Sequence, residues 1–160
     1  MAETPPITFE CRHQTTVSLA EIVDNILVLE NWTTFTGWGP LPGIRAATFD
    51  SRTPELVGTK FRVVSTNGDQ HTETITRWEP GRLLETRMAD FPRSLRWMAT
   101  HFIERWITEG DLARDGHHTV VRQFEMFPTS GMTRPLLRMI GFMMRQAVNR
   151  HSTAVLPAPA

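Results

Sequence analysis

The segment between Arg45 and Met126 is a series of short runs rich in Val, Ile, Thr, Phe and Trp. Turn residues separate these runs at 66–69, 79–82 and 110–116. Strands joined by such short turns pair in antiparallel order, so the segment constrains the fold to an antiparallel meander. The pattern predicts strands near 46–49, 58–65, 70–78, 82–88, 100–109 and 119–127, and an irregular stretch at 90–98.

Residues before this segment predict one strand and one helix. Polar and less polar residues alternate from 7 to 17, as in a half-buried strand. Ser18 and Glu21 then have the spacing of a capping box, and apolar residues recur at helical intervals up to about residue 30. Residues 31–44 contain two Pro, three Gly and several aromatic residues, which predicts an irregular loop.

A long helix is predicted after the meander, from Pro135 to Thr153. Its predicted apolar face contains Leu136, Met139, Ile140, Met143, Met144, Ala147 and Val148, and we expect Leu136, Ile140, Met143 and Ala147 to be buried against the sheet. Arg138 and Arg145 lie on the opposite, solvated face. Residues 155–160 are expected to form a loose tail.

The predicted order of elements is strand, helix, six strands and long helix. The chain has 160 residues and no repeat or midchain linker, so we expect one domain over 1–154. An antiparallel sheet needs a cover on one face, and the long helix is the element able to supply it. The predicted fold class is therefore α+β, with a curved sheet around the C-terminal helix.

Composition excludes several classes of function. Lys plus Arg and Asp plus Glu each number 17, so no net charge favours nucleic acid. Cys11 is the only cysteine, which rules out an intramolecular disulfide or a cysteine-based zinc site and suits a reducing compartment. No metal site, nucleotide-binding loop or other cofactor motif is found. The first residues carry no secretion signal, and no apolar run approaches the roughly 18 residues of a membrane span, so we expect a cytoplasmic protein without membrane insertion.

The hairpin formed by 100–109 and 119–127 allows inward and outward side chains to be assigned. Phe102, Glu104 and Trp106 share one face with Arg122 and Phe124, and this face carries the bulkier apolar side chains. It should therefore face the core, where Glu104 and Arg122 would be costly unless they pair. We predict that they meet. Their sequence positions leave open whether the pair anchors a ligand or only supports the structure.

The order of elements, the stretches Glu30-Asn31-Trp32 and Trp78-Glu79-Pro80-Gly81-Arg82-Leu83, and the Met-rich helix after Pro135 resemble the SRPBCC group, also called START-like or helix-grip proteins. Within this group the chain is most similar to bacterial polyketide cyclase/dehydrase-type members. The resemblance implies a curved sheet of about seven strands that grips the C-terminal helix around a hydrophobic cavity. Different members use that cavity for lipids, sterols, quinones, plant hormones or polyketide intermediates.

The leading hypothesis is binding of a small hydrophobic molecule, such as a lipid, quinone or polyketide-like compound, in this cavity. The predicted ligand-binding residues are Glu104, Arg122, Phe102, Trp106, Phe124, Met143 and Trp38. One alternative is an enzyme of the cyclase, aromatase or dehydratase type, with Glu104, Arg122 and His101 as acid–base candidates. Another is an interaction module that presents the aromatic loop around Trp38 to a partner. The sequence leaves open the ligand, any catalysis and the oligomeric state.

Overall fold

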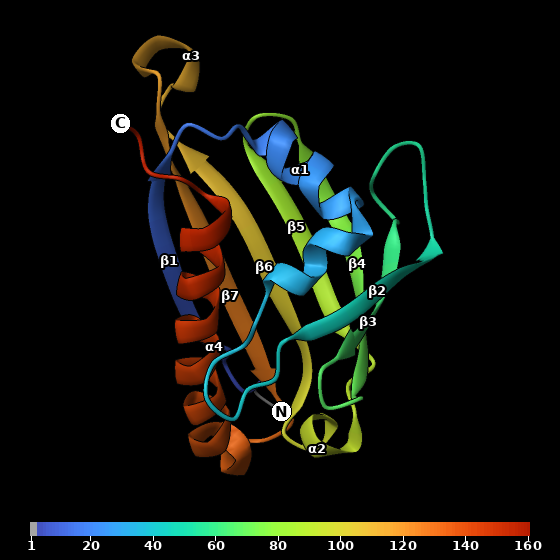
Figure 1. The fold of residues 1–160 in the computed structure, drawn as a ribbon. Helices are drawn as coiled ribbons and strands as arrows, with labels where there is room; N and C mark the ends of the chain where they lie inside the picture. Colours follow the sequence, from blue (N-terminus) through green and yellow to red (C-terminus); the bar gives the residue numbers. More distant parts are fainter. Residues whose placement is uncertain (1–2) are drawn as a thin grey trace.

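The computed structural model describes residues 3–160, which form one curved antiparallel sheet with the first helix and the long C-terminal helix on its concave side (Figure 1). The sheet has seven strands in the order β1-β7-β6-β5-β4-β3-β2. The strands are β1 (Ile7–Thr15), β2 (Ile44–Ser51), β3 (Lys60–Ser65), β4 (Gln70–Glu79), β5 (Leu83–Ala89), β6 (Ala99–Glu109) and β7 (His118–Pro128). The α-helices are α1 (Leu19–Leu27), α2 (Arg93–Arg96), α3 (Leu112–Asp115) and α4 (Arg134–Val155), and the 3-10 helices are η1 (Leu29–Thr34) and η2 (Gly131–Thr133).

The predicted fold class is confirmed, and each predicted strand is present with shifted ends. β2 through β7 follow one another as neighbours, while β1 pairs with β7 at the opposite edge. The stretch at 90–98, expected to be irregular, contains the single turn of α2. This topology places the inner faces of β4, β5, β6 and β7 side by side beneath the helices.

Helix α1 begins at the predicted capping box. Ser18 Oγ accepts from the Glu21 backbone N–H at 3.2 Å, and Glu21 Oε2 accepts from the Ser18 backbone N–H at 2.7 Å. The helix ends at Leu27, earlier than predicted, because Val28 has an extended backbone. The chain then continues as η1, so the predicted loop begins with a 3-10 turn.

Helix α4 packs along β1 and β7, as Figure 1 shows, but its buried face differs from the prediction. Leu136 is 42% exposed and Met139 is 55% exposed, whereas Leu137 is fully buried. The buried positions are Leu137, Gly141, Met144, Ala147, Val148 and Ser152. Of the four residues expected to be buried, Ala147 is buried, Ile140 and Met143 are half-buried and line the cavity, and the expectation for Leu136 is wrong. The apolar arc of α4 is wider than its contact with the sheet, so hydrophobicity alone does not locate that contact. Arg138 and Arg145 are exposed as predicted.

The C-terminal segment is attached to the fold beyond the expected boundary at residue 154. Helix α4 reaches Val155, and Leu156 is buried. Thr15 Oγ1 donates a hydrogen bond to the Pro157 carbonyl at 2.9 Å. These contacts hold the beginning of the expected loose tail against β1. Within residues 3–160 no helix is both long and apolar enough to cross a membrane.

Candidate functional site

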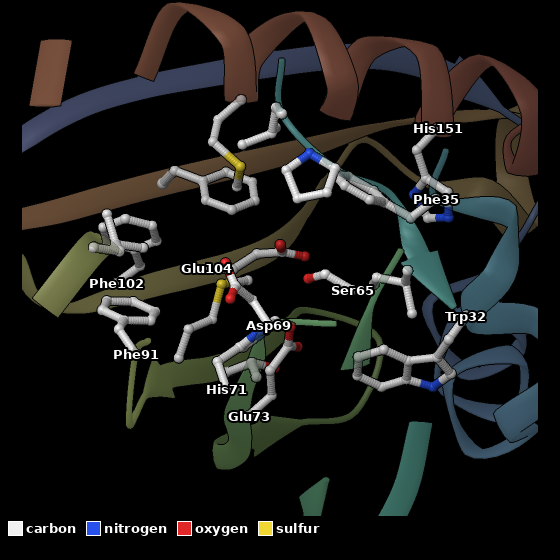
Figure 2. Close-up of a pocket in the computed structure, with 18 of the residues that line it drawn as sticks. Trp32, Phe35, Ser65, Asp69, His71, Glu73, Phe91, Phe102, Glu104 and His151 are labelled. Carbon is white, nitrogen blue, oxygen red and sulfur yellow. Dashed lines mark hydrogen bonds and ion pairs between the residues drawn. The ribbon is translucent and has the colours of Figure 1, made fainter. Parts of the chain in front are cut away.

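A cavity of about 440 Å³ lies between the inner face of the sheet, α4 and the segment from η1 to β2. Figure 2 shows Phe91 and Phe102 at one end of the cavity, with Trp32 and Phe35 at the other. The rest of the wall combines aliphatic, methionine, proline and three further aromatic residues with a comparable number of polar side chains. Six of the seven predicted ligand-binding residues line the cavity: Phe102, Glu104, Trp106, Arg122, Phe124 and Met143.

Glu104 on β6 and Arg122 on β7 form the predicted ion pair. Arg122 Nη2 donates to Glu104 Oε1 at 3.1 Å and to Oε2 at 3.4 Å. The exposed fractions of the two side chains are 8% for Glu104 and 5% for Arg122. The guanidinium also lies 3.9 Å from the centroid of the Trp106 ring, in a cation–π contact. The alternation of side chains along the two strands was therefore sufficient to predict this pair.

Burial raises the pKa of the Glu104 carboxyl, because desolvation disfavours its charged form. The positive charge of Arg122 acts in the opposite direction and limits this increase. The nearby carboxyl of Glu73 adds to the increase in the pKa of Glu104. Glu73 is thus close enough to Glu104 to disfavour the charged form of the Glu104 carboxyl.

His151 on α4 supports Arg122 from the side opposite Glu104. Arg122 Nη1 donates to His151 Nδ1 at 2.8 Å and to Ser152 Oγ at 3.2 Å. Burial, and secondarily the charge of Arg122, lower the pKa of His151 to about 3. The imidazole is therefore neutral near pH 7 and carries its proton on Nε2, which lies 3.1 Å from Thr34 Oγ1. His151 was not predicted from the sequence, although it follows Met144 by two helical turns on the same side of α4.

His71 and Glu73 on β4 form a second polar pair on the cavity wall. Their Nε2 and Oε1 atoms are 2.9 Å apart, and Glu73 is buried. The short turn before β4 pairs His71 with Val63 and Glu73 with Phe61. His71 and Glu73 therefore face inward with these apolar side chains of β3. The faces of β4 could not be assigned from the sequence, and the strand contains a register shift between Ile75 and Arg77. The threonines of the same strand, Thr72, Thr74 and Thr76, do not line the cavity.

Two sequence-based candidates lie elsewhere. Trp38 does not line the cavity, because its backbone pairs with Leu41 in a tight turn and its ring contacts Phe142 on α4 at a centroid distance of 5.7 Å. Trp32 and Phe35 from the same segment line the cavity instead. His101 lies on the other face of β6, where its ring stacks on Phe127 at 4.3 Å. It cannot serve as an acid or base inside the cavity.

The thiol of Cys11 is buried near α4, and burial raises its pKa, which makes a thiolate nucleophile unfavourable there. Among residues 3–160, no group of three or more His, Cys, Asp or Glu side chains is placed to hold a metal ion. The polar chemistry of the cavity is thus that of carboxyl, imidazole, hydroxyl, guanidinium and side-chain amide groups.

No protein-family model matches this chain, and no curated protein matches it by sequence. Solved structures match over nearly its whole length. The ginseng major latex-like protein 151 from Panax ginseng is 10% identical with a TM-score of 0.63, over 96% of this chain and 99% of that one. Ara h 8.0201 is also 10% identical, with a TM-score of 0.59, over 93% of this chain and 99% of that one.

The third similar structure is the di-domain ARO/CYC protein BexL from the BE-7585A biosynthetic pathway. It is 10% identical with a TM-score of 0.64, and the match covers 97% of this chain but only 51% of BexL. At this level of identity the similarities establish the fold. The chain has the helix-grip fold, as its sequence resemblance predicted.

Proposed function

We propose that this protein binds one small hydrophobic molecule in the cavity between the sheet and α4. The observation that carries the proposal is the cavity itself, about 440 Å³ in volume and walled mainly by aromatic and aliphatic side chains. Protein interiors are normally packed without voids of this size, so the apolar wall gains contacts when a ligand fills it. The helix-grip fold is compatible with this use, but it does not select the ligand.

A cavity-filling substitution tests this proposal. Ile140 lines the cavity from α4, so Ile140→Trp should occupy space that a ligand needs. We expect this variant to bind Nile red, a neutral apolar fluorophore, at least about tenfold more weakly than the wild type in a fluorescence titration. Met139→Trp is the matched control, because Met139 is the adjacent residue and is 55% exposed. It should bind within about twofold of the wild type.

Two results would overturn the proposal. One is the absence of saturable binding by the wild-type protein to Nile red and to lipid, quinone and aromatic probes. The other is equal loss of affinity in both tryptophan variants, because this would place the probe on the surface of α4. Thermal unfolding of the wild type and both variants checks that a loss of binding does not come from misfolding.

An acid–base enzyme of the cyclase, aromatase or dehydratase type is the second candidate. The ionisable groups of Glu73, His71 and Glu104 line one cavity, which is a suitable arrangement for proton transfer. The name of BexL includes ARO/CYC, and its fold is similar over one half of its length. Incubation with a synthetic poly-β-ketone thioester tests this candidate. The candidate is supported if the wild-type protein forms cyclised product faster than the buffer alone and Glu104→Gln reduces that rate about a hundredfold. A wild-type rate equal to that of the buffer alone, or an equal rate in the variant, would refute it.

For the cellular compartment we propose the cytoplasm, because Cys11 is a free thiol and a reducing environment preserves it. Subcellular fractionation of the native host tests this proposal. Recovery of the protein outside the cytoplasmic fraction would contradict it.

A further inference from the structure

The inner face of the sheet carries a polar row across four adjacent strands. Arg122 lies on β7, Glu104 on β6, Thr86 on β5 and Glu73 on β4, and each lines the cavity. Glu104 is paired directly with Thr86 in the strand register. We use the name polar row for these four residues.

Apolar side chains border the polar row on both sides. Along β6, Glu104 lies between Phe102 and Trp106, and along β5, Thr86 lies between Leu84 and Met88. Figure 2 shows the carboxyl of Glu104 in the middle of the cavity, between the two aromatic ends. A ligand that fills both ends must therefore pass over the polar row.

Arg122 is the cation of the polar row, but its charge is already engaged. One terminal nitrogen donates to Glu104, the other donates to His151 and Ser152, and Trp106 covers the guanidinium face. The remaining nitrogen, Nε, is buried and has no hydrogen-bond partner within residues 3–160. Arg122 therefore has little capacity to bind a ligand carboxylate in the way that a free arginine would.

Two further groups of the polar row have no protein partner within the described residues, the second carboxyl oxygen of Glu73 and the hydroxyl of Thr86, and both of them can accept a hydrogen bond. Glu73 uses Oε1 toward His71, and Oε2 has no protein donor within the described residues. Thr86 also lines the cavity, and its hydroxyl makes no hydrogen bond to another of residues 3–160. Because a carboxylate accepts strongly from O–H donors and repels anions, a ligand hydroxyl is stabilised here and a ligand carboxylate is not.

We infer that the ligand is a neutral hydrophobic molecule with a hydroxyl group between two apolar parts, and that Glu73 selects it against carboxylic acids of similar shape. This inference rests on the proposed function, because it requires that the cavity be the binding site. It identifies Glu73 as a specificity-determining residue, with the Thr86 hydroxyl as a second contact.

Three probes of one shape test the inference: anthracene, hydroxyanthracene and anthracene carboxylate, substituted at the same carbon. In calorimetric titrations of the wild type we expect hydroxyanthracene to bind at least about tenfold more tightly than anthracene. We expect the carboxylate to bind at least about a hundredfold more weakly than hydroxyanthracene. Equal affinity for anthracene and hydroxyanthracene would overturn the inference while leaving the proposed function intact. No binding by any probe would overturn both.

Glu73→Gln separates selection by Glu73 from the general cost of burying an anion. Glutamine keeps the shape but supplies a donor and removes the charge, so the preference for hydroxyanthracene over the carboxylate should fall at least about fivefold. Glu85→Gln is the matched control, since Glu85 lies on the outer face of β5 and pairs with Arg105 at 2.8 Å. It should leave the preference unchanged. An equal effect in both variants, or an unchanged preference in Glu73→Gln, would overturn the role of Glu73.

If Glu73→Gln fails to fold, Thr86→Val gives an independent measurement with an isosteric change. The affinity for hydroxyanthracene should fall about threefold or more, and the affinity for anthracene should stay unchanged. Equal changes for both probes would contradict a contact between the ligand hydroxyl and the polar row.

Discussion

Arg122 connects the sheet to the C-terminal helix through hydrogen bonds to three side chains. It donates to Glu104 on β6 and to His151 and Ser152 on α4, while its guanidinium covers the Trp106 ring. Both terminal nitrogens of this buried cation are engaged, and Nε alone has no partner within residues 3–160; such engagement makes a buried guanidinium tolerable. The same contacts position the polar side of the cavity wall.

Removal of one partner of the buried Glu104–Arg122 ion pair should strongly destabilise the protein. We expect Glu104→Met and Arg122→Met each to lower the free energy of unfolding by about 3 to 5 kcal/mol, because each strands a buried charge. The double variant should lose at least about 2 kcal/mol less unfolding free energy than the two single variants lose together, as measured by urea denaturation. The exposed pair Arg62–Asp50, at 2.8 Å, is the control and should show a coupling below about 1 kcal/mol. Similar coupling in the two pairs would contradict the buried assignment.

His151 should make stability depend on pH in a defined direction. Its pKa is about 3 in the folded protein against an ordinary value of 6.5, so between these values the unfolded chain binds the extra proton. Stability contributed by the neutral imidazole is therefore present above pH 6.5 and declines as the pH falls toward 3.

We expect this residue to account for a loss of about 2 kcal/mol between about pH 7 and pH 5. His151→Asn keeps an acceptor near the position of Nδ1 and cannot be protonated, so its unfolding free energy should fall less over this range. The difference between the two proteins isolates His151 from Glu104, whose raised pKa acts in the opposite sense. Parallel pH profiles would show that His151 is not buried as described.

Sequence periodicity predicted the Glu104–Arg122 pair because both residues occur in strands with clear alternation and a matching set of bulky neighbours. It could not predict that His151 joins them, since this contact depends on how α4 is rotated against the sheet. His71 and Glu73 were missed for a related reason: the face that a β4 residue occupies depends on a register that shifts within the strand.

At the level of elements, α4 shows how far amphipathicity alone can be used. The helix was predicted to within two residues at each end, but its contact with the sheet follows Leu137, Gly141, Met144 and Val148. Gly141 lies at the centre of this contact, where a Cβ atom would come 3.4 Å from Met126 Sδ. Hydropathy gives glycine little weight, so the sequence pattern did not locate the line of closest approach.

Neighbouring leucines on α4 provide a direct test of the corrected face. Leu137→Ala should lower the free energy of unfolding by about 2 to 5 kcal/mol, because it leaves a cavity at a fully buried position. Leu136→Ala should cost less than about 1 kcal/mol, because Leu136 is 42% exposed. Chemical denaturation of both variants gives the comparison. A larger loss for Leu136→Ala would restore the face that the sequence pattern predicted.

At the scale of the whole molecule, the curved sheet and α4 enclose more volume than their side chains fill. Sequence order and resemblance predicted this architecture because β-forming runs, turn residues and a long amphipathic helix are all local features. The lining of the cavity depends on long-range packing. Trp32 and Phe35 reach it while Trp38 turns away, although all three occur in one short aromatic segment.

Methionine methyl groups offer the most direct measurement of ligand position. Met88, Met98, Met143 and Met144 line the cavity, whereas Met132 and Met139 are 91% and 55% exposed. Methyl NMR spectra recorded during titration with hydroxyanthracene should show shifts of the four lining methionines that saturate at one ligand per chain, with Met132 and Met139 unchanged. Shifts confined to Met132 and Met139, or shifts that do not saturate, would contradict binding inside the cavity.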